Sequence, residues 1–287
     1  MKPITSKATR VANNPWFMVV AGLSSIIAFV GYLYDKTTPE PSTLGLVALG
    51  FALAILSVGY VYSIKVRSEN IALRSLSEVF YEINLIYKNT LYQLFSGSTP
   101  VTNPTDLLTE EERVLRSVCQ RIENIFSRVI GRNCMVTVKL ITKENSKYYA
   151  HTYVRSQELS KRDSSEKLKF VVGTGDNNGF DKTLSNRSDG LPLHFYSPDL
   201  QKESDYSNQR QHFYRHYRST LVVPICGENK GKEGTPDQFD RVGFLCVDTL
   251  SINRLNNGYH LYMLSALANQ MYNFMSLMRG KYTVFVG

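Results

Sequence analysis

The residues with the richest chemistry lie close together between positions 173 and 218. This segment combines histidines, arginines and aromatic residues, above all in the run from His212 to Arg218. Aromatic rings stack on flat heterocycles, and an arginine can hold a phosphate or carboxylate through two parallel hydrogen bonds. The alternative for the same residues is an exposed amphipathic helix, Tyr206 to Tyr217. From the composition we expect these residues to contact a small ligand: Phe180, His194, Tyr196, Phe213, Arg215 and Arg218.

Motifs typical of enzymes and metal sites are absent or incomplete in the sequence. The glycine-rich stretch Gly173 to Gly179 lacks the Gly-Lys-Ser/Thr ending of a phosphate-binding loop, so its glycines are expected to serve turns with positive φ. No Gly-x-Ser-x-Gly motif occurs. His212 and His216 have the i, i+4 spacing of metal ligands, but no third ligand can be assigned. The sequence therefore predicts a protein without catalytic or metal-binding residues, and it identifies no cofactor.

The four cysteines have no metal-binding spacing and no Cys-x-x-Cys pair. Cys226 and Cys246 fall in two expected neighbouring strands, where a redox pair is one alternative. Because the cysteines lie in apolar runs, we expect buried, reduced thiols that suit a reducing cytosol.

Short apolar runs alternate with turns before and after this segment and predict the sheet that positions it. Strands are expected at 135–141, 148–154, 169–172, 221–225 and 242–247. Apolar residues at spacings of three and four predict a final helix from Leu261 to Met275. An earlier helix is expected to begin with a capping box at Thr109 and Glu112 and to end at Gly131. Strands and helices in this arrangement predict an α+β fold.

Three motifs in the last third resemble the C-terminal half of a GAF domain. They are Val223-Pro224-Ile225, the glycine-containing strand 242–248 and Leu267-Ala268-Asn269-Gln270. The resemblance implies an antiparallel sheet flanked by helices, a ligand pocket whose lid is the segment before the penultimate strand, and a first helix that packs on the last helix and on a partner copy. The cyclic-nucleotide motif of some members is missing, and 173–218 has no cysteine for a bilin.

Two uncharged apolar segments, 16–34 and 44–64, precede this region, and each is long enough for a helix to cross a bilayer. Basic residues flank the pair on both outer sides, which predicts two spans in the inner membrane with both termini in the cytoplasm. The sequence thus divides into a transmembrane hairpin (1–64), a helical linker (65–105) and a GAF-like sensor domain (106–287). The net charge of +8 also fits an anionic partner or ligand.

The linker carries a heptad-like apolar pattern over about three repeats. A parallel coiled coil between two copies and an amphipathic helix packed on its own domain explain this pattern equally well. The residues are Leu73, Leu76, Phe80, Ile83, Tyr87, Leu91 and Leu94.

Together these features predict a membrane-anchored sensor that relays ligand binding through the linker helix to its spans or to a partner. The expected partners are the lipid bilayer, a second copy of the chain in a homodimer, and an unidentified small ligand that is anionic or a nucleotide. No nucleic acid is expected, because the basic residues form no recognition motif. The alternatives are a nucleotide-gated two-span effector that disrupts the membrane, as in antiphage systems, and a dimeric scaffold without a ligand.

Overall fold

The fold was analysed in a computed structural model, which describes residues 41–96, 103–157, 169–185, 193–209, 212–228 and 239–286. The chain forms two compact units, Met1–Ser75 and Leu76–Gly287. Helix α3 (Pro41–Ser96) continues through the boundary between them. The second unit contains the sheet and both predicted flanking helices, so it is the unit that positions the candidate site.

In the first unit the structure describes only the beginning of α3. The predicted span 16–34 lies outside the described residues, and the predicted span 44–64 is part of helix α3. Among the residues that are described, there is no helix that combines the length and the apolar character needed to cross a membrane.

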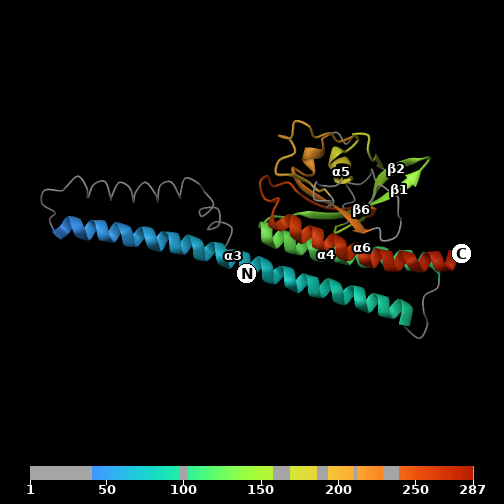
Figure 1. The fold of residues 1–287 in the computed structure, drawn as a ribbon, viewed down its shortest axis with the longest axis horizontal. Coiled ribbons are helices and arrows are strands. Elements are labelled where there is room, and N and C mark those ends of the chain that lie inside the picture. The colour runs from blue at the N-terminus through green and yellow to red at the C-terminus, as the bar shows by residue number, and fades with distance from the viewer. Residues whose placement is uncertain are drawn as a thin grey trace. The chain divides into compact units, whose positions relative to one another are not determined.

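The second unit is built around a six-stranded antiparallel sheet (Figure 1). The strand order across the sheet is β3-β2-β1-β6-β5-β4. The bounds are β1 Met135–Glu144, β2 Lys147–Arg155, β3 Phe170–Val171, β4 Phe195–Ser197, β5 Ser219–Glu228 and β6 Phe239–Thr249. All five predicted strands are present, and β4 is the strand that the sequence did not predict.

The two faces of the sheet have different side chains because neighbouring residues of a strand point to opposite faces. On β1, Val136, Val138 and Leu140 belong to the main hydrophobic core, whereas the alternating residues Thr137 and Lys139 line a cavity on the other face. On β6, Leu245 and Val247 likewise belong to the main core. One face therefore packs against helices, and the other is left for the loops that follow β3.

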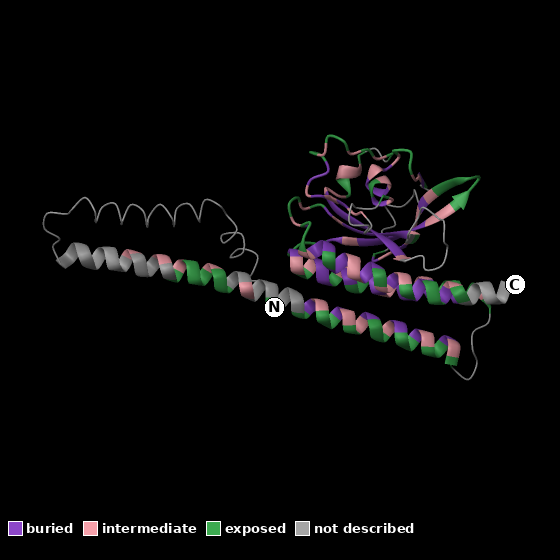
Figure 2. Ribbon diagram, in the orientation of Figure 1, coloured by how far each residue is buried: buried purple, intermediate pink, exposed green. Residues whose placement is uncertain are grey.

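Helices α4 (Pro104–Ile130) and α6 (Tyr259–Val286) lie side by side against the apolar face, and α5 (Asn178–Thr183) lies on the opposite face (Figure 1). Figure 2 shows buried residues concentrated where these helices meet the sheet. The α+β prediction, with an antiparallel sheet flanked by helices, is thus confirmed for this unit. Because α6 continues to Val286, the C-terminal tail extends the last helix.

The start of α4 differs from the prediction. Asn103 is the N-cap, and its side chain accepts a hydrogen bond from the Thr105 backbone N–H at 3.0 Å. Pro104 occupies the first turn, where its missing N–H costs nothing. Thr109 instead lies within the helix and donates its hydroxyl proton to the Thr105 carbonyl. The predicted end is confirmed: Gly131 caps the helix with φ of +65°.

The part of α3 that belongs to the second unit packs on that unit's own helices. The heptad-like residues Ile83, Tyr87 and Leu94 are buried in the main core. Tyr87 stacks on Phe274 of α6 within this packing.

Asn145, Ser146 and Pro224 occupy positions in the sheet that suit their backbone conformations. Asn145 and Ser146 form the β1–β2 hairpin turn with φ of +48° and +65°, the conformation that suits a two-residue hairpin loop. Pro224 lies within β5, opposite Phe244 of β6. Since β4 pairs only with Thr220 to Val222, Pro224 has one neighbouring strand, and its missing N–H is tolerated there.

Candidate functional site

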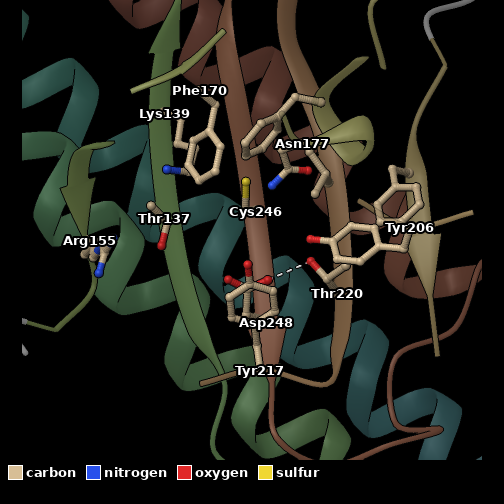
Figure 3. A pocket seen from close by; sticks show the side chains of 13 residues that line it. Thr137, Lys139, Arg155, Phe170, Asn177, Tyr206, Tyr217, Thr220, Cys246 and Asp248 are labelled. Atoms are coloured by element: carbon tan, nitrogen blue, oxygen red, sulfur yellow. Dashed lines mark hydrogen bonds between the residues drawn. The ribbon is translucent and has the colours of Figure 1, made fainter. Parts of the chain in front are cut away.

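A cavity of about 50 Å³ lies between the polar face of the sheet and the loops that cover it (Figure 3). It is about a third of the size of an engineered apolar cavity of roughly 150 Å³ that binds benzene. In this form it fits a molecule of a few heavy atoms. The lining residues are Thr137, Lys139, Arg155, Phe170, Asn177, Phe180, Phe195, Tyr206, Tyr217, Thr220, Val222, Cys246 and Asp248.

The floor of the cavity is built by the strand register. Arg155 of β2 pairs with Thr137 of β1, which pairs with Cys246 of β6, which pairs with Val222 of β5. These four residues therefore form one row across the sheet. Lys139 lies two residues from Thr137 along β1, on the same face.

A second polar row lies beside Cys246. Asp248 pairs with Thr220, whose hydroxyl donates to Asp248 Oδ1 at 2.6 Å (Figure 3). The cations are thus on β1 and β2, and the carboxylate is on β6. The floor therefore carries half-buried charges of both signs.

The ammonium group of Lys139 is surrounded by both a hydroxyl group and aromatic rings. Its ammonium donates to the Thr152 hydroxyl at 3.0 Å and lies 5.1 Å from the ring centroid of Phe170 and 5.6 Å from that of Phe180. Both ring distances are within the range of cation–π attraction. Arg155 also donates to Thr152, at 3.2 Å, so one hydroxyl fixes both cations.

The covering segment, residues 170–183 and 193–218 in the described ranges, is called the lid here. Its first loop is held by Asp181, whose carboxylate accepts from the backbone N–H groups of Gly173 and Gly175 at 2.6 and 2.7 Å. Both glycines have φ near +87°, as the sequence predicted for this stretch. Asn177 caps α5 through a hydrogen bond from the Gly179 N–H. The loop amides that a phosphate would need therefore already bind an internal carboxylate.

Aromatic rings form the roof of the cavity. Phe180 stacks on Phe244 of the sheet, with ring centroids 4.9 Å apart, and Phe195 stacks on Tyr206 at 5.7 Å. The Asn208 amide donates to the hydroxyls of both Tyr206 and Tyr217. Burial, and next the proximity of Tyr217, raises the pKa of Tyr206 well above its usual range. The roof is thus an apolar, neutral surface above a charged floor.

Of the six residues expected to contact a ligand, Phe180 lines the cavity. Phe213 packs behind the roof, edge-on to Tyr206 at 5.1 Å. Arg215 is exposed in a short 3-10 helix (Phe213–Arg215), which replaces the longer amphipathic helix considered from the sequence.

The other three expected residues make contacts that fix the lid. Arg218 holds the buried carboxylate of Asp199 through two hydrogen bonds of 2.9 Å. His194 Nε2 lies 2.6 Å from the side-chain oxygen of Asn257. Tyr196 donates its hydroxyl proton to the Leu255 carbonyl at 2.9 Å. His194 and Tyr196 thus join the lid to the segment before α6, whereas Arg218 and Asp199 both belong to the lid. None of the three expected residues lines the cavity.

Sequence reasoning missed the charged floor. In the sequence, Thr137 and Lys139 indicate only the polar side of a half-buried strand. The signal that could have identified them is that Asp248 directly follows a buried run on the strand next to β1 in the sheet. A charge of each sign on neighbouring buried strands indicates a shared polar site.

The cysteines agree with the buried-thiol prediction, since all four are free and buried. Cys226 pairs with Arg241, five residues along β6 from Cys246, so the two cysteines are far beyond disulfide reach. Burial, opposed by Arg241, raises the pKa of Cys226 to about 11. Within the described residues, no group of three histidine, cysteine or acidic side chains is arranged to hold a metal ion.

No protein-family model matches the sequence, and no curated protein matches it. Solved GAF domains are similar in structure. The GAF domain of a phosphoenolpyruvate-protein phosphotransferase from Coxiella burnetii has 13% identity and a TM-score of 0.41, over 74% of this chain and 96% of that one. The corresponding Acinetobacter domain has 12% identity and a TM-score of 0.38, over 63% and 98%. A far-red cyanobacteriochrome photoreceptor has 12% identity and a TM-score of 0.38, over 61% and 96%.

Proposed function

We propose that this chain, whose second unit has a GAF-like fold, is a non-enzymatic sensor that binds a small molecule between the sheet and the lid. The observation that carries the proposal is the cavity with a charged floor and an aromatic roof. Small-molecule sites combine apolar walls with a few polar groups that fix orientation, and this cavity has that composition. Lys139, Arg155 and Asp248 on the floor are half-buried, where charged groups can orient a bound molecule.

The same strands offer a route from the ligand to the helices. Thr137 and Cys246 face the cavity, while their neighbours Val136, Val138 and Leu245 face the main core. A shift of either strand on ligand binding therefore changes its packing against α4 and α6. A ligand can drive such a shift only by binding one arrangement more tightly than the other.

From α6 the route continues to α3. Within the second unit, Tyr87 of α3 stacks on Phe274 of α6, and the Gln270 amide donates to the Asn84 side-chain oxygen at 3.3 Å. Because α3 is a continuous helix from Pro41 to Ser96, we propose that it is the output element.

We further propose that the output reaches the inner membrane through segments 16–34 and 44–64, with both termini in the cytoplasm. This part of the proposal is supported by the two apolar runs and the basic residues that flank them. A homodimer joined through helices of the sensor unit belongs to the same proposal. Reconstituting the full chain in liposomes and measuring dye leakage with and without ligand distinguishes an anchor from an effector that disrupts the membrane.

The direct experiment is a thermal-unfolding screen of the purified full chain against small metabolites. A ligand at a hundred times its dissociation constant stabilises the folded state by about 2.7 kcal/mol, which raises the unfolding temperature measurably. Val222→Phe enlarges a side chain that lines the cavity, and we expect it to abolish the shift in a protein that still folds. The proposal is wrong if every compound that shifts the parent chain shifts Val222→Phe equally.

A further inference from the structure

Strand β4 (Phe195–Ser197) is one of the two edge strands of the sheet. It has three residues, and it pairs with β5 along one side. An element held by few backbone hydrogen bonds opens at a lower free-energy cost than a strand bonded along both sides. β4 is therefore among the elements of the sheet that a change in the cavity displaces most readily.

The two faces of β4 have different contacts, because successive side chains of a strand point to opposite faces. Phe195 lines the cavity. Tyr196 packs against the main core instead, and its hydroxyl donates to the Leu255 carbonyl at 2.9 Å. Next to the strand, His194 Nε2 lies 2.6 Å from Asn257 Oδ1. β4 thus touches the cavity with one face and the segment before α6 with the other.

The segment before α6 is also held by its backbone and its core contacts. The Asn253 N–H donates to the Pro198 carbonyl at 3.0 Å. The Leu255 side chain is buried in the main core. Residues 253–257 and their partners in 194–198 are called the latch here. A displacement of β4 therefore acts on residues 253–257 through three hydrogen bonds.

The latch ends at the first turn of α6. The Asn256 side-chain oxygen accepts hydrogen bonds from the backbone N–H groups of Gly258 and His260, each at 3.2 Å. In return, the Asn256 N–H donates to His260 Nδ1 at 3.1 Å. Such bonds satisfy amides at a helix N-terminus that have no partner within the helix. Displacing residues 255–257 therefore moves the group that caps α6.

We infer that the latch is a second route from the cavity to α6, in which displacement of Phe195 loosens the N-terminal cap of that helix. It differs from the route through β1 and β6, because it reaches the start of α6 rather than the face packed on the sheet. Coupling between two sites is reciprocal, so loosening the cap also loosens β4. As a route for a ligand signal, the latch rests on the proposed function.

The test is hydrogen exchange in a cycle of variants of the full chain, without any ligand. Gly179→Ala perturbs the roof of the cavity, since a Cβ there would lie 2.9 Å from Phe195 Cδ1. Phe195→Leu is a second roof variant, which removes the ring itself. Tyr196→Phe combined with Asn257→Ala removes the two side-chain contacts of the latch.

The readouts are exchange in β4 and at the amides of Asn256, His260 and Tyr262. The last of these donates to the Gly258 carbonyl in the first turn of α6. With the latch intact, a roof variant should speed exchange in β4 and, by at least about threefold, at the three amides. In the variant without the latch contacts, adding a roof variant should change exchange at the three amides by less than about twofold.

The matched control combines Tyr81→Phe with Asn269→Ala, which removes the same two groups from exposed positions on α3 and α6. A roof variant should act in this control as it does in the parent chain. The inference is wrong if the roof variants speed exchange in β4 but not at the three amides. Equal acceleration without the latch contacts would assign the coupling to another route.

Failure to alter exchange in β4 with either roof variant would show that Phe195 does not control this strand, which also contradicts the inference. Because the cycle uses no ligand, its result is independent of the metabolite screen. The latch can fail while a compound shifts the unfolding temperature, and the sensor proposal then stands. The coupling can equally be present while nothing in the screen binds, and the sensor proposal then fails.

Discussion

The ring of Tyr87 lies parallel to the ring of Phe274, with centroids 4.4 Å apart and an interplanar angle of 11°. Both side chains are buried, at 6% and 2% exposure. This stack joins α3 to α6 within the second unit, so it is the contact through which the proposed output helix is tied to the sensor.

Truncating this stack should be costly, whereas removing only the hydroxyl should not. Tyr87→Ala leaves a cavity and is expected to lower the free energy of unfolding by about 3 kcal/mol. Within the described residues the buried Tyr87 hydroxyl has no hydrogen-bond partner, so Tyr87→Phe is expected to be neutral or to stabilise by about 1 kcal/mol. Denaturant unfolding of the three proteins checks this, and a large loss in Tyr87→Phe would show that the hydroxyl has a partner.

The approach of β1 to β6 depends on the absence of a side chain at Gly243. A Cβ atom there would lie 2.1 Å from the Lys139 backbone oxygen, which cannot move without breaking the strand pairing. Gly243→Ala is therefore expected to destabilise by about 3 kcal/mol. The matched control is Gly280→Ala in exposed α6, where a Cβ meets nothing within 4 Å, and it should stabilise by about 0.5–1 kcal/mol. Equal stabilities of the two variants would contradict this account of the sheet.

The buried imidazole of His260 predicts sensitivity to acid. Its Nδ1 accepts the Asn256 N–H, and burial lowers its pKa to about 4. In the unfolded chain the pKa is near 6.5, so between pH 6.5 and 4 the unfolded state binds more protons and stability falls as the pH falls. At pH 5 the loss from this residue is about 2 kcal/mol. His260→Asn keeps an acceptor without titrating, so its stability should fall less between pH 7 and 5; parallel curves for the two proteins would contradict the prediction.

The lid loop should open when Asp181 is replaced. Asp181→Ala removes the acceptor for the Gly173 and Gly175 amides, so hydrogen exchange at these amides is expected to accelerate at least tenfold while exchange in the core strands stays unchanged. Asp106→Ala, in the first turn of α4, is the control for a lost surface carboxylate. Unchanged exchange at both glycines would show that another group holds this loop.

The sheet and the last helix could be predicted because their signals are local. In β1, apolar and polar residues alternate around Val136 and Val138 because only one face of the strand is buried in the main core. In α6, apolar residues recur at spacings of three and four from Leu261 to Met275 because one face of the helix is buried. The predicted position of Gly131 as a helix cap also followed from its own conformational freedom.

The site could not be predicted to the same extent, because its residues meet only through the sheet register. Arg155, Thr137 and Cys246 are distant in sequence and become neighbours across three strands. The aromatic and basic run near Arg218 was the more conspicuous signal. Arg218 in this run holds the lid through its contact with Asp199, which no local pattern specifies.

The central claim is that a small molecule binds between the sheet and the lid. Hydrogen-exchange mass spectrometry on the full chain, with and without the strongest compound from the thermal screen, tests it most directly. The account predicts slower exchange in the lid, in 170–183 and 193–218, and in the strands around Thr137 and Cys246, with no such change in Val222→Phe. Protection confined to α4 and α6, or protection that persists in Val222→Phe, would place the ligand elsewhere and contradict the account.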